Sequence, residues 1–168
     1  ETHSDLVINP SANSMGQNND ESAYCIRHES KEKGSLMVYD LSGVYGEWTD
    51  EYIRGFYLGD DRNTLTIRDE LKLKNESDIV WNMITASEIT VSSDGKTAVL
   101  SQNGKMLNVT AQCSEENWQF EIAEDLAPTG GWADVTLNDG FGGNKTYTVD
   151  RQKEFASGYR KLLLKTKA

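Results

Sequence analysis

The feature that most constrains the fold is a period-two alternation of apolar and polar residues along much of the chain. Its longest stretch is Thr64–Lys74 (TLTIRDELKLK), where Ile67 and three leucines share one parity while Thr66, Arg68, Glu70 and Lys72 share the other. Apolar residues two apart line one face of a β-strand, whereas an amphipathic helix needs them three or four apart. No segment of the sequence supports an amphipathic helix of three turns.

Further short runs of β-forming residues predict strands over 5–9, 35–40, 51–58, 79–85, 88–92, 97–102, 105–111, 118–123, 145–149 and 160–165. Asp94-Gly95 and Asn103-Gly104 favour two-residue hairpin turns, because both dipeptides tolerate a positive φ. They predict a three-stranded meander over 88–111. Many short strands in 168 residues predict an all-β fold, a large antiparallel β-sandwich that forms a single domain over residues 1–168.

The charge balance is strongly acidic, with 17 Lys and Arg against 27 Asp and Glu and a net charge of -10. Residues 1–150 carry 11 basic and 26 acidic side chains, whereas residues 151–168 carry six and one. This balance argues against nucleic acid as a partner, since a dedicated binder presents a basic face. No apolar run approaches the roughly 18 residues of a membrane span. The two cysteines, Cys25 and Cys113, either form one bridge in a secreted protein or remain two small buried hydrophobes.

The familiar short catalytic motifs are missing: there is no Gly-rich phosphate loop, no His-Glu-x-x-His and no Gly-x-Ser-x-Gly. Asp60 and Asp61, with Asn63, are oxygen ligands of the kind that calcium prefers. The same residues suit a solvated turn between two strands, and this interpretation is the favoured one. The pair Cys25 and His28 is a weak candidate for a thiol nucleophile, since such partners are usually distant in sequence.

Asp69 is the exception in the longest strand, because it places a carboxylate on the parity otherwise occupied by Ile67 and leucines. A buried carboxylate must be paired or hydrogen-bonded, and Arg54 on the preceding predicted strand is the natural partner. A short connection over 59–63 allows the two strands to be neighbours. The favoured interpretation is a structural ion pair, and substrate binding by Arg54 and Asp69 is the alternative.

Several aromatic residues lie beside glycines in predicted loops, namely Tyr45, Trp48, Trp132 and Phe141. Aromatic faces provide large apolar contact with polar handles, so Tyr45, Trp48 and Trp132 are candidate substrate-binding residues of a sugar platform. The alternative is that they cap the ends of the sandwich.

A series of short blocks resembles the heparinase II/III-like polysaccharide lyases in order along the chain. The blocks are Thr2–Asn9 (THSDLVIN), Gly16-Gln17, Val38–Tyr45 (VYDLSGVY), Tyr52–Gly55 (YIRG), Ile67–Leu71 (IRDEL) and the strand around Trp81. Each block alone is only moderately specific, and their order carries the resemblance. It covers most of residues 2–112.

The resemblance implies a two-part enzyme, with an N-terminal α/α toroid followed by an antiparallel β-sandwich and a catalytic cleft between them. The reaction is β-elimination at a uronic acid, in which a Tyr or His base removes the C5 proton. We therefore expect this chain to be a fragment that lacks the upstream toroid and is non-catalytic alone. The expected partners are that toroid and an acidic polysaccharide such as a glycosaminoglycan, for a secreted bacterial parent in the periplasm or at the cell surface.

His3 matches the family histidine that opens the Leu-Val-Ile strand and that ligates a structural zinc in some members. The other ligands of that zinc would lie upstream of Glu1, so we expect no cofactor in this chain alone and zinc only in the full-length parent. Two other functional classes stay open: a free-standing carbohydrate-binding module and a structural domain of a surface protein.

Overall fold

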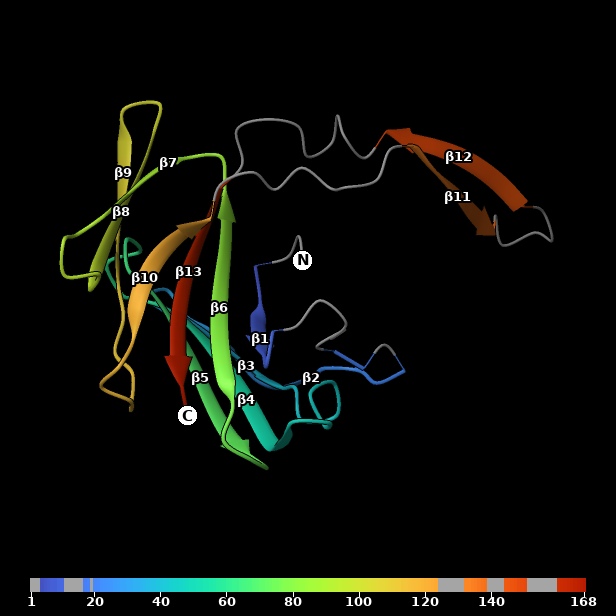
Figure 1. The fold of residues 1–168 in the computed structure, drawn as a ribbon, viewed down its shortest axis with the longest axis horizontal. Coiled ribbons are helices and arrows are strands. Elements are labelled where there is room, and N and C mark those ends of the chain that lie inside the picture. Colours follow the sequence, from blue (N-terminus) through green and yellow to red (C-terminus); the bar gives the residue numbers. More distant parts are fainter. Residues whose placement is uncertain (1–3, 11–16, 19, 124–131, 139–143, 151–159) are drawn as a thin grey trace. The chain divides into compact units, whose positions relative to one another are not determined.

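A computed structural model of the chain describes residues 4–10, 17–18, 20–123, 132–138, 144–150 and 160–168. These residues form strands and turns without a helix, and every strand pairing with a recorded register is antiparallel (Figure 1). The predicted all-β class is therefore confirmed. The strands are β1 Leu6–Ile8, β2 Tyr24–Ser30, β3 Ser35–Asp40, β4 Thr49–Leu58, β5 Leu65–Leu73, β6 Asp78–Thr85, β7 Glu88–Val91, β8 Thr97–Gln102, β9 Lys105–Thr110, β10 Gln119–Ala123, β11 Trp132–Asn138, β12 Asn144–Asp150 and β13 Arg160–Lys167.

Two strands were not predicted from the sequence, β2 and β11. In β2 a β-bulge shifts the register between Cys25 and Arg27, and almost every side chain of the strand is exposed. The extra residue of a bulge interrupts period-two alternation. A strand of this kind shows no regular apolar face in its sequence, and it was missed for that reason.

The chain divides into two compact units, and the second comprises residues 7–79 with 167–168. Its main element is the four-stranded antiparallel sheet β2-β3-β4-β5, in which strands follow one another in chain order. The register places Tyr39 opposite Arg54 and Arg54 opposite Asp69. Residues directly opposite each other point to the same face of a sheet, so these three side chains form one row across β3, β4 and β5.

The first unit comprises residues 1–6 and 80–166, and two sheets face each other across its core. One sheet, β7-β8-β9, contributes Ala98 and Leu100, and the other contributes Phe120, Leu162 and Leu164. Partly buried residues pack against this cluster, namely Trp81, Met83, Ile89, Val91, Val109, Ala111, Cys113 and Trp118. Apolar side chains from two opposed inner faces are what builds a β-sandwich core.

The sheet that contains β10 has the order β1-β6-β13-β10. Backbone hydrogen bonds from Asn9 to Asp78 and from Asn82 to Asp5 run β1 antiparallel to β6. Ser77 and Ala168 exchange two backbone hydrogen bonds beyond the ends of β6 and β13. The middle strand β6 therefore lies between β1 and β13, which come from opposite ends of the sequence.

The predicted meander is confirmed as β7-β8-β9, but only one of its two turns is the predicted type. Asn103 and Gly104 both have positive φ, at 50° and 72°, as a two-residue type I′ turn requires. At Asp94-Gly95 only the glycine has positive φ, and the connection runs from Ser92 to Lys96. There the Asp94 carboxylate accepts hydrogen bonds from the Ser92 hydroxyl and the Lys96 backbone N–H, which stabilise the longer turn.

Both cysteines are free, with Cys25 exposed on β2 and Cys113 half-buried. The expectation of two buried hydrophobes is therefore wrong for Cys25, because β2 leaves its side chains in solvent. Among the described residues, the fold contains no helix that is long and apolar enough to cross a membrane.

We predict that Gly104→Ala lowers the free energy of unfolding by about 1 kcal/mol, because an L side chain is disfavoured at a φ of 72°. A Cβ at Gly104 would meet no atom within 4 Å, so the loss isolates the backbone conformation. Urea denaturation measures it. The matched control is Gly55→Ala in β4, where the nearest atom is the Arg68 carbonyl oxygen at 4.0 Å. If both variants lose the same stability, the assigned turn type is wrong.

Candidate functional site

The predicted pairing of Arg54 with Asp69 is confirmed as a bidentate ion pair between β4 and β5. Arg54 Nε donates to Asp69 Oδ1 at 2.5 Å, and Arg54 Nη2 donates to Asp69 Oδ2 at 3.0 Å. The two residues are directly opposite in the strand register, and their side chains are only 12% and 15% exposed. Planar guanidinium and carboxylate groups match each other in this geometry, which strengthens the bond beyond a single contact.

Tyr52 completes this group from the same face of β4, two residues before Arg54. Its hydroxyl donates to Asp69 Oδ1 at 2.9 Å, and its ring lies 5.7 Å from the Arg54 guanidinium carbon. Tyr45 packs edge-on against the Tyr52 ring at 4.9 Å between centroids. Gln17 Nε2 then donates to the Tyr45 hydroxyl at 2.8 Å. We call these five residues (Gln17, Tyr45, Tyr52, Arg54 and Asp69) the Arg54 cluster.

The segment between β3 and β4 folds back as successive turns and so brings Tyr45 to this cluster. The Tyr45 N–H donates to the Leu41 carbonyl, and the Tyr45 carbonyl accepts from the backbone N–H groups of Trp48 and Thr49. The Thr49 hydroxyl also donates to that carbonyl at 3.2 Å. Satisfied backbone groups allow the loop to bury its aromatic ring, which is 2% exposed.

The electrostatics of the cluster favour a protonated Tyr52 beside a charged ion pair. Burial raises the pKa of Tyr52 well above its usual value, and the negative charge of Asp69 raises it further. Burial by itself lowers the pKa of Arg54, but the Asp69 hydrogen bond and nearby groups outweigh it and leave that pKa raised. Arg54 therefore remains a cation and Tyr52 remains a neutral donor.

This arrangement suits structure better than proton transfer. A general base needs a pKa near the working pH and access to a substrate proton. Tyr52 is fully buried, and its hydroxyl is already committed to Asp69. The Asp69 carboxylate already accepts three hydrogen bonds from Tyr52 and Arg54. The Arg54 cluster therefore connects β4 to β5 and to the loop between β3 and β4.

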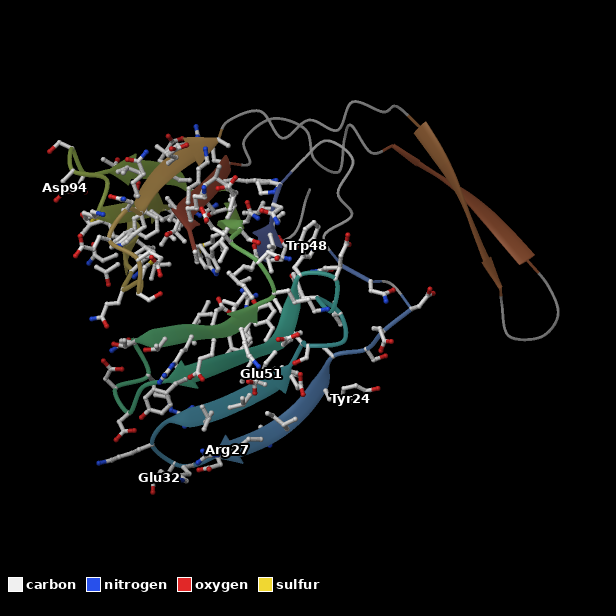
Figure 2. The ribbon with its side chains drawn as sticks, turned by 60° about the horizontal axis from the view of Figure 1, so that its bottom comes forward. Tyr24, Arg27, Glu32, Trp48, Glu51 and Asp94 are labelled. Atoms are coloured by element: carbon white, nitrogen blue, oxygen red, sulfur yellow. The ribbon has the colours of Figure 1, made fainter. Side chains whose placement is uncertain are left out.

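The three candidate aromatics have different environments. Tyr45 is buried, with 2% of its surface exposed. Trp48 is half-buried in the segment that leads into β4, where Figure 2 labels it, and its buried Nε1 has no hydrogen-bond partner among the described residues. Trp132 begins β11 opposite Asp150, and its side chain lies outside the described part. Substrate binding by these three residues, and by Arg54 and Asp69, stays a prediction.

The metal prediction falls on His3, which lies outside the described residues, as does Phe141. Within the described ranges, no group of three or more His, Cys, Asp or Glu side chains is placed to hold a metal ion. Asp61, one of the calcium candidates, instead accepts hydrogen bonds from the N–H groups of Asn63 and Thr64 and from the Thr64 hydroxyl. These bonds lower its pKa. This carboxylate closes the turn, as the favoured interpretation expected.

Sequence reasoning missed Tyr52 and Gln17 as members of the cluster. A signal for Tyr52 was present, since it precedes Arg54 by two residues and so shares its strand face. No local pattern could identify Gln17, because it lies 28 residues from Tyr45 in sequence, with β2 and β3 between them.

Comparisons with known proteins give a likeness of fold. No family model matches the chain, and no curated protein matches its sequence. The chain is similar in structure to a mutant of the heparan sulfate lyase HepC from Pedobacter heparinus, with a TM-score of 0.57 and 7% sequence identity. The match covers 99% of this chain and 24% of the lyase, so the chain spans about a quarter of that enzyme's length. This likeness supports a heparinase-like fold.

We predict that Arg54→Ala lowers the free energy of unfolding by about 3–5 kcal/mol, because it leaves the buried Asp69 carboxylate without its cation. The matched control is Arg68→Ala, which breaks the exposed ion pair with Glu70 on the same strand. Exposed ion pairs contribute little, so this control should keep nearly all of the stability. Equal losses in the two variants, measured by urea denaturation, would contradict the structural role of the buried pair.

We predict that the stability contributed by Tyr52 declines at alkaline pH. Tyrosine in an unfolded chain ionises near pH 10, and the folded-state pKa of Tyr52 is higher. The contribution is therefore fully present below about pH 10 and is lost as the pH rises above it. Tyr52→Phe should make the fall in unfolding free energy between about pH 9 and pH 11 shallower. Tyr24→Phe, which removes the hydroxyl of a tyrosine that is 63% exposed, is the control and should leave most of that slope intact.

Proposed function

We propose that this chain is the β-sandwich part of a heparinase II/III-like polysaccharide lyase whose parent cleaves uronic-acid-containing polysaccharide by β-elimination. The observation that carries the proposal is the structural likeness to a heparan sulfate lyase over 99% of this chain. The ordered sequence blocks between residues 2 and 112 support the same assignment independently of the coordinates. Fold alone does not fix function, so the two lines of support matter together.

In this proposal the chain contributes no catalytic group of its own. β-Elimination needs a base that reaches the C5 proton of a bound uronate. Tyr45 and Tyr52 are buried in the core, and the Tyr52 hydroxyl is bonded to Asp69. We assign the base and the groups that neutralise the uronate to an upstream α/α toroid, and in this proposal the sandwich supports that domain and forms one wall of the cleft.

The charge of the chain limits which part of the parent holds the acidic polysaccharide. Residues 1–150 carry a net charge of -15, which repels an anionic glycan at long range. Residues 151–168 carry a net charge of +5. Uronate recognition in the parent is therefore assigned to the toroid and to this basic C-terminal segment. We place the parent in the bacterial periplasm or at the cell surface, with zinc bound by His3 and ligands upstream of it.

The experiment compares this chain with the product of its longer reading frame. Each is incubated with heparan sulfate, hyaluronan, chondroitin sulfate and alginate, and the ultraviolet absorbance of the unsaturated uronate product is followed. We predict that the longer protein produces this absorbance on at least one substrate and that the chain alone produces none. A catalytically active isolated chain would overturn the non-catalytic assignment.

The same preparations separate the remaining alternatives. If no upstream helix-rich region exists and the isolated chain binds a glycan on an array, the chain is a carbohydrate-binding module and the lyase proposal fails. A longer protein that neither cleaves nor binds any uronate polysaccharide also contradicts the proposal and favours a structural surface domain.

A further inference from the structure

The outer strand of the three-stranded sheet, β9, has one unpaired side. Within the described part of the chain, β9 pairs with β8 alone, and β8 lies between β7 and β9 (Figure 1). The first four side chains of β9, from Lys105 to Asn108, are all exposed, and Met106 is 77% exposed. A strand edge of this kind offers a row of free backbone N–H and C=O groups to another strand.

The turn fixes which backbone groups are free. In a two-residue hairpin the residues that flank the turn, here Gln102 and Lys105, form a hydrogen-bonded pair. Hydrogen-bonded pairs alternate along an antiparallel ladder, so Leu107 and Val109 also direct their backbone groups toward β8. Met106, Asn108 and Thr110 therefore direct theirs away from β8, to the open side.

Two other edge strands, β2 and β5, carry features that hinder such pairing, and β9 carries neither of them. The edge strand β2 has a β-bulge, and Glu29 forms ion pairs with both Arg27 and Lys31. The edge strand β5 presents Arg68, Glu70 and Lys72 on one face. Bulges and charges are the usual protection of sheet edges. β9 has an uninterrupted register with β8, and its one charged side chain is Lys105 at the turn.

A second observation concerns the side chains. Leu107 and Val109 lie opposite Leu100 and Ala98, so they point to the core face of the sheet. Val109 packs against the core, but Leu107 is 48% exposed, and none of the described strands pairs with β9 on its far side. An added strand on the open side would extend the sandwich core over this leucine.

The open edge of β9 offers a second copy of this chain a region without acidic side chains. The chain carries a net charge of -10, so two copies repel each other over most of their surfaces. Residues 97–114 contain one lysine and no acidic residue. The open edge of β9 is therefore a place where two copies can meet without opposing carboxylates.

We propose that two copies of this chain associate through β9 in an antiparallel, two-fold symmetric pairing centred on Asn108. In this register Asn108 faces Asn108 of the second copy, and Met106 faces the second copy's Thr110. Leu107 then faces the second copy's Val109 on the core face, which gives an apolar cross-strand pair. The two Lys105 side chains lie at opposite ends of the pairing. The result is a continuous six-stranded sheet, β7-β8-β9 from each copy.

The test measures the molar mass of the chain by sedimentation velocity across a concentration series. We expect a reversible dimer, and amide hydrogen exchange should show concentration-dependent protection at 106, 108 and 110. Asn108→Pro removes an outward N–H without removing a bond to β8, so the fold survives. It should raise the dissociation constant of the dimer by at least about tenfold. Asn108→Thr keeps the N–H and should remain dimeric.

A chain that is monomeric at every concentration overturns the proposal. So does a dimer whose dissociation constant is the same in a folded Asn108→Pro variant. If Asn108→Pro fails to fold, Leu107→Lys replaces it, because a lysine opposite the second copy's Val109 should weaken the dimer while the monomer stays folded. The proposal does not depend on the lyase assignment, and lyase activity has no bearing on these measurements.

Discussion

The ion pair between Arg54 and Asp69 is the interaction on which the sheet β2-β3-β4-β5 depends. Both charges lie on a face that also carries Phe56 and Ile67, so neither is stable there without the other. A slip of two residues between β4 and β5 would place Arg54 opposite Ile67 or Leu71 and leave both charges unpaired. The pair therefore makes the observed register more stable than its neighbours. Tyr52, which is hydrogen-bonded to Asp69, also packs against Tyr45 and so holds the loop before β4 against the sheet.

The sequence predicted those parts of the molecule that follow from local pattern. Alternation in residues 64–74 predicted β5, and an acid on its apolar parity predicted a buried pair with Arg54. The pattern failed where geometry is not local. β2 contains a bulge that shifts its register, and the Asp94-Gly95 turn is lengthened by hydrogen bonds to the Asp94 carboxylate. Tyr45 was predicted in a loop, either as a sugar-binding aromatic or as a cap on the end of the sandwich, and the burial of its ring depends on hydrogen bonds within that loop that no local pattern shows.

The acidity of the chain has a structural use in the residues described. Asp40, Asp61 and Asp94 accept hydrogen bonds within turns, and these bonds hold the pKa of each carboxyl below its usual value. Glu76 and Glu121 instead form ion pairs with Lys167 and Lys165. Carboxylates that close turns and pair with lysines need no substrate to explain them.

The same charge distribution bears on how sheet edges are used. Like charges on different molecules repel one another over about 8 Å at physiological ionic strength, so two acidic chains approach more easily where acids are sparse. Arg68, Glu70 and Lys72 keep β5 solvated, and the ion pairs of Glu29 do the same for β2. β9 differs because its core-facing residues, Leu107 and Val109, extend the apolar face of β8 to the edge of the sheet. An edge that is neutral, regular in register and apolar on one face gains hydrogen bonds and apolar burial together when another strand pairs with it.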